Sequence, residues 1–201
     1  MPIYVDHEKR REAIIDATWR IIEKRGFDGV SMRHIASEAG FANGSLTPYF
    51  TNKDEILEAA FARVTDLTMR RAQTRSLHVT GVKAIREFCL EIMPIDDPKI
   101  VEARIVIAFW DRALVSPTIR ALLDEAWDSH RQVLERLITD ARVSGEITTT
   151  RTDASIIDAL TWFITGLQSR VLFAPHHTSS SRQVMTFDML LEALIVDAPN
   201  D

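Results

Sequence analysis

Apolar residues recur every three to four positions along almost the whole chain, which is the spacing of one face of an α-helix. The period is clearest in one stretch, whose apolar positions are Ile56, Leu57, Ala60, Phe61, Val64 and Leu67. No segment shows the strict alternation of apolar and polar residues that a half-buried strand would require. The pattern therefore predicts an all-α protein of about nine helices.

Glycines, capping residues and prolines set the limits of the predicted helices. Gly26 and Gly40 are placed to end the first two helices, and Ser31 is placed to cap the second. Asp97-Pro98 and Ser116-Pro117 each put a capping residue before a proline at the first helical position. Together these signals predict helices over about 8–25, 32–39, 43–50, 53–76, 81–93, 97–115, 117–143, 153–173 and 181–196.

The two short predicted helices at 32–39 and 43–50 are joined by a turn that contains Gly40. Two short helices joined in this way form a helix-turn-helix, which places its second helix in the major groove of DNA. Sequence-specific DNA binding is therefore the leading functional hypothesis from the pattern alone.

The charge of the chain limits how it could bind DNA. The net charge is −5, and residues 1–55 carry eight basic and nine acidic side chains. Such a balance argues against indiscriminate attraction to nucleic acid, so the positive charge must be placed locally. The basic side chains available to contact phosphates are Lys9, Arg10, Arg11, Arg33 and Lys53.

Other features exclude several classes of protein. Apolar runs are far shorter than a membrane span, and the N-terminal residues lack the apolar segment of a signal peptide. Cys89 is the single cysteine, which fits a reducing cytoplasm. The histidines lack metal-ligand spacing, and no P-loop, nucleophile elbow or dinucleotide fingerprint is present. We therefore expect a cytoplasmic protein that is not an enzyme and needs neither a metal nor a cofactor.

The first 60 or so residues resemble the TetR family of bacterial one-component transcriptional regulators. The resemblance rests on the spacing of Ala39-Gly40, Gly44-Ser45-Leu46, Tyr49-Phe50 and Lys53. Residues 81–196 resemble, more weakly, the C-terminal domain of BetI-like members, through Ile107-Ala108-Phe109-Trp110 and similar short motifs. The resemblance implies a helix-turn-helix DNA-binding domain over 1–55 and a ligand-binding and dimerisation domain over 56–201, linked by the helix at about 53–76.

The family resemblance also implies which side chains meet DNA. Asn43, Ser45 and Thr47 would reach base edges, and Gly44 would let the backbone approach closely. The resemblance implies that Tyr49 and Lys53 contact phosphates. Ser31 and Arg33 would do the same at the helix predicted over 32–39. Thr47 and Pro48 depart from the aromatic residues that many members carry, and the proline is expected to distort the helix at 43–50.

An effector pocket is expected among aromatic and apolar residues of the second domain. The candidates are Phe88, Met93, Phe109, Trp110, Trp127, His130 and Trp162. Three tryptophans among them could form a cage for a quaternary ammonium group, although each is also a plausible core residue. The apolar residues of the helices at 153–173 and 181–196 exceed one internal face, which favours pairing with a second copy of the chain.

These inferences combine into one functional hypothesis. The protein would be a ligand-responsive regulator of transcription, by default a repressor, that binds a palindromic operator in double-stranded DNA as a homodimer. A small-molecule effector would release it, and no membrane would be involved. The alternative is an all-α protein that binds small molecules or other proteins and whose helix-turn-helix no longer reads DNA. Pro48 and the absence of Arg or Lys from 43–50 support that alternative.

Overall fold

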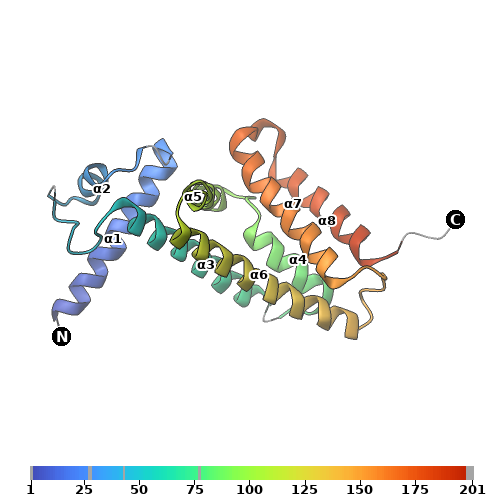
Figure 1. Ribbon diagram of the computed structural model, residues 1–201. Coiled ribbons are helices and arrows are strands. Elements are labelled where there is room, and N and C mark those ends of the chain that lie inside the picture. Colours follow the sequence, from blue (N-terminus) through green and yellow to red (C-terminus); the bar gives the residue numbers. More distant parts are fainter. Residues whose placement is uncertain (1, 27–28, 43, 77, 198–201) are drawn as a thin grey trace. The chain divides into compact units, whose positions relative to one another are not determined.

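The computed structural model in Figure 1 describes residues 2–26, 29–42, 44–76 and 78–197. Within these residues there is no strand, which confirms the predicted all-α class. The elements are α1 (Pro2–Arg25), α2 (Met32–Ala39), α3 (Lys53–Ser76), α4 (Gly81–Ile92), α5 (Asp97–Ala113), α6 (Pro117–Val143), α7 (Asp153–Phe173), the 3-10 helix η2 (Pro175–His177) and α8 (Ser180–Ile195). The described residues form eight α-helices, one fewer than the nine that the sequence predicted.

The ends of α2 and the start of α3 follow their local sequence. The Ser31 hydroxyl accepts a hydrogen bond from the backbone N–H of His34 at 3.2 Å, which satisfies one of the free donors of the first turn. Gly40 ends α2 in the left-handed conformation, with φ of 74°, and glycine adopts this conformation without steric cost. At the start of α3, Asn52 Oδ1 accepts from the N–H of Glu55 at 3.0 Å.

The starts of α5 and α4 are capped differently from what their local sequence predicts. Asp97 was predicted to cap α5, but the carboxylate of Asp96 accepts from the N–H of Lys99 at 3.0 Å, and Asp97 is the first helical residue. At α4, the carboxylate of Glu146 accepts from the N–H of Val82 at 3.0 Å. A residue 64 positions away therefore caps α4, which a search of neighbouring residues cannot find.

The chain divides into two compact units, each made of two segments that are separated in the sequence. Unit 1 comprises Met1–Thr65 and Arg104–Arg120, and unit 2 comprises Asp66–Ala103 and Ala121–Asp201. Helices α3, α5 and α6 each contribute residues to both units. The functional boundary predicted near residue 55 concerns DNA and ligand binding, and the two units do not test it.

Unit 1 has a core built from one face of each of its helices. Ile14, Ala17 and Ile21 of α1 are buried, as their spacing predicted. They pack with residues of α2, of the segment 44–50 and of the first half of α3. The largest completely or almost completely buried side chains in this core are Ile14, Ile22, Ile35, Leu46, Phe50, Ile56 and Ile105. Ile105 comes from α5, which is why part of that helix belongs to unit 1.

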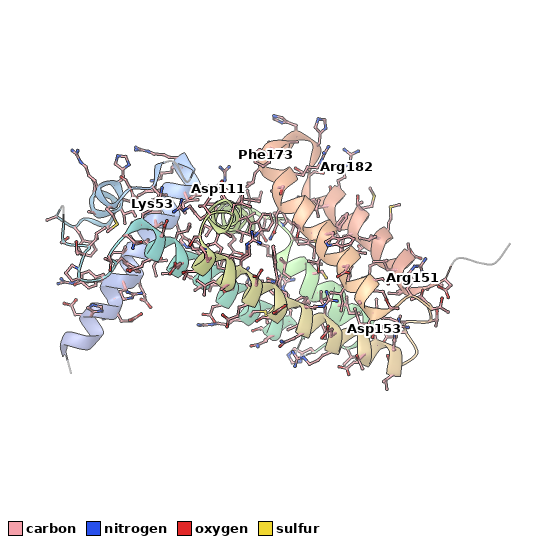
Figure 2. The ribbon with its side chains drawn as sticks, in the orientation of Figure 1. Lys53, Asp111, Arg151, Asp153, Phe173 and Arg182 are labelled. Atoms are coloured by element: carbon pink, nitrogen blue, oxygen red, sulfur yellow. The ribbon has the colours of Figure 1, made fainter. Side chains whose placement is uncertain are left out.

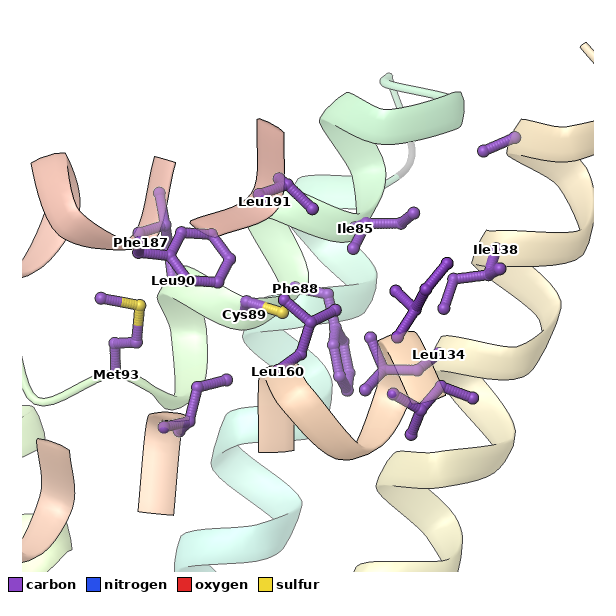
Figure 3. Packing of buried hydrophobic residues seen from close by; sticks show 14 of the residues in the cluster. Ile85, Phe88, Cys89, Leu90, Met93, Leu134, Ile138, Leu160, Phe187 and Leu191 are labelled. Atoms are coloured by element: carbon purple, nitrogen blue, oxygen red, sulfur yellow. The ribbon is translucent and has the colours of Figure 1, made fainter. Parts of the chain in front are cut away.

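Unit 2 has a larger core, drawn in Figure 3, which combines residues of α4, α6, α7 and α8 with Ala72 of α3. Phe88, Cys89 and Phe187 lie at its centre, each at most 1% exposed. Helices α7 and α8 run side by side along one side of this unit (Figure 1). Burial of this apolar surface is the main source of stability in unit 2.

A group of charged side chains is buried beside the core of unit 2. The Arg71 guanidinium donates two hydrogen bonds to the Glu102 carboxylate at 2.8 and 2.7 Å, and a third to Glu91 at 2.9 Å. Arg75 and Lys99 approach the other oxygen of Glu91 at 2.6 and 3.6 Å. Because Glu91 is only 1% exposed, this ionic cluster joins α3, α4 and α5 within the protein interior.

Candidate DNA-binding surface and effector-binding residues

The predicted helix at 43–50 is not an α-helix in the structure. Residues 44–49 form consecutive turns, and Asn43 lies outside the described residues. The N–H groups of Tyr49 and Phe50 both bond to the carbonyl of Leu46, at 2.8 and 2.9 Å. Pro48 has no N–H to donate, so the regular pattern of i to i−4 hydrogen bonds cannot continue through this segment. The distortion expected from Pro48 accounts for the missing helix.

The turn segment is fixed from inside and presents polar groups outside. Leu46 and Phe50 are each 2% exposed and anchor it in the core of unit 1. Gly44 and Thr47 are exposed, and Gly44 has φ of 87°, which disfavours any residue with a Cβ. The Ser45 hydroxyl donates to the carbonyl of Ala42 at 2.7 Å. Gly44 and Thr47 are therefore the accessible members of this part of the predicted site.

Tyr49 is held by three residues of α1. The ring of His7 lies 4.7 Å from the Tyr49 ring, centroid to centroid. Arg10 Nη1 donates to the Tyr49 hydroxyl at 3.2 Å, and Arg11 Nη1 donates to the Tyr49 carbonyl at 2.6 Å. The Arg11 guanidinium also lies 4.2 Å above the ring of Phe50, at a distance typical of a cation–π contact. The N-terminal part of α1 and the turn segment thus form one continuous surface.

Arg10 and Arg11 were predicted as basic side chains available to phosphates, but their contacts with Tyr49 were not predicted. The signal was present, because positions 7, 10 and 11 lie on the same helical face as the buried Ile14. The hydrogen bond to Tyr49 and, next, the negative charge of Asp6 raise the pKa of Arg10. Arg10 is therefore a permanent cation on this surface.

The other predicted DNA contacts lie at helix starts within unit 1. Ser31 is half-buried and acts as the cap of α2, whereas Arg33 in the first turn of α2 is exposed. Lys53 is the half-buried first residue of α3 and is labelled in Figure 2. Helix starts carry free N–H groups and a partial positive charge, which attract phosphate. These placements make a phosphate-binding role chemically reasonable, and the role itself stays a prediction.

Three of the predicted effector-binding residues belong to the interior of unit 2. Phe88 and Met93 are at most 1% exposed. The ring of His130 meets Phe88 edge to face, with centroids 6.1 Å apart. Burial lowers the pKa of His130, so its imidazole is neutral at physiological pH and can both donate and accept a hydrogen bond.

The remaining four predicted effector-binding residues are placed differently. Phe109 and Trp110 belong to unit 1, where Phe109 stacks on Phe61 with centroids 3.8 Å apart. Trp127 and Trp162 belong to unit 2 and are 43% and 72% exposed. The structure therefore does not gather the three tryptophans of the predicted cage within one unit. An effector pocket that includes all seven residues remains a prediction.

Helices α7 and α8 carry an exposed apolar surface. Trp162 and Phe173 on α7 are 72% and 80% exposed, and Figure 2 labels Phe173 near the end of that helix. Met185 and Met189 on α8 are also exposed and line a shallow groove with Ile95 and Val184. Exposed apolar surface of this extent is typical of a site of protein association.

The part of the chain that the structure describes contains neither a metal-binding cluster nor a membrane-spanning helix. There, no group of three or more His, Cys, Asp or Glu side chains is arranged to hold a metal ion. None of the helices in these residues combines the length and the apolar character that crossing a membrane requires.

A short helix, a glycine turn, the turn segment at 44–50 and a long helix follow one another in the order of a helix-turn-helix protein. The family model for bacterial regulatory proteins of the tetR family matches residues 14–60. The model for the C-terminal part of BetI-type transcriptional repressors matches residues 82–196, more than half of the chain. The chain belongs to the TetR family, with a C-terminal domain of the BetI type, which confirms the resemblance inferred from the sequence.

Individual relatives are similar over part of their length. The HTH-type transcriptional regulator PksA of Bacillus subtilis is 37% identical over 110 residues, which cover 54% of this chain and 54% of that protein. The HTH-type transcriptional regulator BetI of Burkholderia mallei is 32% identical over 127 residues, which cover 61% and 64%. The matched stretch thus spans less than two thirds of either relative.

Solved structures show the same fold at lower identity. A transcriptional regulator from Saccharomonospora viridis in complex with choline aligns with a TM-score of 0.87 and 23% identity, covering 95% of this chain and all of that one. The regulator FadR from Bacillus subtilis in complex with stearoyl-CoA aligns with a TM-score of 0.72 and 19% identity, covering 92% and 97%. At these identities the likeness establishes the fold of the chain.

Proposed function

We propose that this protein is a ligand-responsive transcriptional regulator that binds double-stranded DNA as a homodimer in the cytoplasm. The observation that carries the proposal is the match of residues 14–60 to the tetR family model, on a unit whose surface presents Gly44, Thr47, Tyr49 and Lys53. Repression of a palindromic operator is the proposed mode of action. We assign the protein no catalytic activity and no cofactor.

In this proposal, base recognition depends on small polar groups and on the shape of the DNA. Asn43, Gly44, Ser45 and Thr47 offer no positive charge to guanine, so discrimination rests on neutral contacts and on DNA deformation. The phosphate contacts come from Tyr49, Lys53, Arg33 and the start of α2 at Ser31. Affinity should therefore decrease steeply as salt is added.

The dimer is proposed to form through the exposed apolar faces of α7 and α8. A dimer with twofold symmetry presents two identical recognition segments, and their half-sites would be separated by whole turns of DNA, each about 34–36 Å. The exposed Trp162, Phe173, Met185 and Met189 support this assignment, because an isolated chain would leave them in water. Replacing Met185 and Met189 together by Asp should give a monomer in analytical ultracentrifugation and abolish operator binding.

The effector is proposed to bind in unit 2, near Phe88, Met93 and His130. Choline and stearoyl-CoA, bound by two proteins of similar fold, differ greatly in size and charge, so the fold alone does not specify the effector. Release from DNA requires an effector that binds the free form of the dimer more tightly than the DNA-bound form. Because α3 contributes to both units, it is the proposed connection between effector and DNA binding.

The first test is fluorescence anisotropy of the protein with labelled DNA from upstream of its own gene, with scrambled DNA as competitor. We expect saturable binding that survives the competitor and weakens in a Tyr49→Phe, Lys53→Ala variant. The matched control is Lys83→Ala on the exposed surface of α4, which removes the same charge from unit 2 and should leave affinity unchanged.

The alternative, a helix-turn-helix that no longer reads DNA, is favoured by one specific observation. Residues 44–49 form turns instead of an α-helix, because Pro48 interrupts the backbone hydrogen bonds. If a genome-wide selection of bound fragments yields no enriched sequence for the folded dimer, this alternative replaces the regulator. With the DNA assay in hand, choline and a long-chain acyl-CoA are the first effectors to add.

A further inference from the structure

Arg10 makes two sets of contacts at the edge of the proposed DNA-binding surface. Its Nη1 atom donates to the hydroxyl of Tyr49 at 3.2 Å. Its Nε and Nη2 atoms face the two carboxylate oxygens of Asp6, one helical turn earlier, at 3.3 and 3.2 Å. The guanidinium is thus positioned by a tyrosine on one side and occupied by a carboxylate on the other.

The Tyr49 hydroxyl retains a donor. A tyrosine hydroxyl that accepts the hydrogen bond of Arg10 still carries a proton, which it can give to another acceptor. A guanidinium and a hydroxyl that lie within hydrogen-bonding distance of each other can both donate to one phosphate oxyanion. Arg11 supports this geometry from the core side, through the Tyr49 carbonyl and the ring of Phe50.

Asp6 already pairs with the Nε and Nη2 groups of Arg10, so the guanidinium must leave Asp6 before it can turn, beside Tyr49, to a phosphate. Carboxylate and phosphate both accept paired hydrogen bonds from a guanidinium, so they compete for the same N–H groups. The side chains of Arg10 and Asp6 are 48% and 61% exposed, and pairs this exposed are held weakly enough to exchange partners.

We propose that Arg10 and Tyr49 form a clamp for one DNA phosphate, and that Asp6 is an internal competitor which occupies the clamp in the free protein. On binding, Arg10 exchanges the Asp6 carboxylate for the phosphate, and Tyr49 donates to the same group. The proposal rests on the proposed function, because it specifies how the regulator holds the DNA backbone. Asp6 thereby lowers the affinity for all DNA and leaves discrimination between sequences to the turn segment.

The competition gives Asp6 an effect that depends on Arg10. Asp6→Asn removes the competing charge and should tighten binding two- to fivefold, roughly the strength of an exposed ion pair. Arg10→Ala should weaken binding and reduce the slope of log affinity against log salt by about one, as expected for the loss of one phosphate contact. In the Arg10→Ala background, Asp6→Asn should change affinity by less than about twofold.

Two controls distinguish competition from a general effect of charge. Glu8→Gln removes an exposed negative charge two residues further along α1, and any effect should be equal with and without Arg10. Asp66→Asn breaks the Asp66–Arg70 pair on α3, which has the same spacing of four residues but belongs to unit 2. It should leave DNA affinity unchanged.

The experiment uses the full chain and a labelled duplex of arbitrary sequence at low salt, because phosphate contacts do not depend on base sequence. Circular dichroism confirms that each variant is folded. Equal effects of Asp6→Asn in both backgrounds, or equal effects of Asp6→Asn and Glu8→Gln, would overturn the competition. Failure of the wild-type protein to prefer any operator would instead overturn the proposed function, and it is detected separately with sequence-specific DNA.

Discussion

The two units of this protein place their charged groups in different surroundings. In unit 1, the carboxylates of the ion pairs, Asp6, Asp16, Glu38 and Asp54, are 32–61% exposed. In unit 2, Glu91 and Glu102 are 1% and 9% exposed and share Arg71. Exposed pairs contribute little to stability and can change partners, whereas the removal of one partner from a buried pair is costly. Unit 1 can therefore offer its charges to DNA. Unit 2 also has exposed pairs, such as Asp66–Arg70, but it uses the buried Glu91 and Glu102 to hold helices together.

The largest effect that we predict comes from the buried cluster. Glu91→Gln should destabilise the protein by about 3 kcal/mol or more, because it removes the buried carboxylate charge that Arg71, Arg75 and Lys99 share. Urea unfolding followed by circular dichroism measures the change. Asp16→Asn, which breaks the exposed pair with Arg63 in unit 1, should cost less than about 1 kcal/mol. Similar losses for both variants would contradict the contrast between the units.

A second contrast concerns glycines with positive φ at helix ends. In unit 2, a Cβ on Gly81 would lie 1.8 Å from the Glu146 carboxylate that caps α4, whereas a Cβ on Gly40 in unit 1 would meet nothing within 4 Å. Both substitutions to Ala strain the backbone, by about 1–3 kcal/mol. Gly81→Ala should cost more, because it also displaces Glu146. If Gly81→Ala lowers the melting temperature no more than Gly40→Ala does, the Glu146 cap contributes nothing to stability.

The two hydroxyl caps provide a matched pair across the units. Ser31 in unit 1 and Thr152 in unit 2 each accept a hydrogen bond from the third residue of a helix at 3.2 Å. Replacing either by Ala should cost about 1 kcal/mol of stability. Only Ser31→Ala should also weaken DNA binding in the anisotropy assay. If both variants bind DNA equally well, Ser31 is a helix cap without a contact to DNA.

The smallest predicted effect is a dependence of stability on pH in unit 2. Burial lowers the pKa of His130 below its ordinary value of 6.5, so the unfolded chain binds the proton more readily than the folded protein does. The stabilising contribution of the neutral imidazole is complete above pH 6.5 and is lost as the pH falls toward the folded pKa. His130→Phe should flatten this part of the curve of unfolding free energy against pH. An unchanged curve would mean that other groups control it.

Much of the fold could be predicted because its determinants are local. The helical period, the cap at Ser31 and the glycines at positions 26 and 40 are each encoded within a few residues. The prediction of a helix at 43–50 was wrong, although the distortion expected from Pro48 was read from the sequence. The packing of Ile105 in the core of unit 1 could not be predicted, because its partners lie far away in the sequence.

The candidate site was less predictable than the fold. The family motif places Tyr49 and Lys53 in a helix-turn-helix, but it does not show that Arg10 and Arg11 bond to Tyr49 across 39 and 38 positions. Aromatic composition suggested a tryptophan cage, yet composition cannot tell a buried indole from an exposed one. Trp162, at 72% exposed, instead lies on a face suited to association.

The single cysteine of the chain has a practical consequence. Cys89 is completely buried in unit 2, and burial raises the pKa of its thiol to about 12, so the folded protein should be inert to thiol reagents. Labelling can then occur only when α4 transiently separates from the helices around it. The rate of labelling by a thiol reagent thus reports how often this unit opens in the wild-type protein, and an effector that binds there should lower that rate.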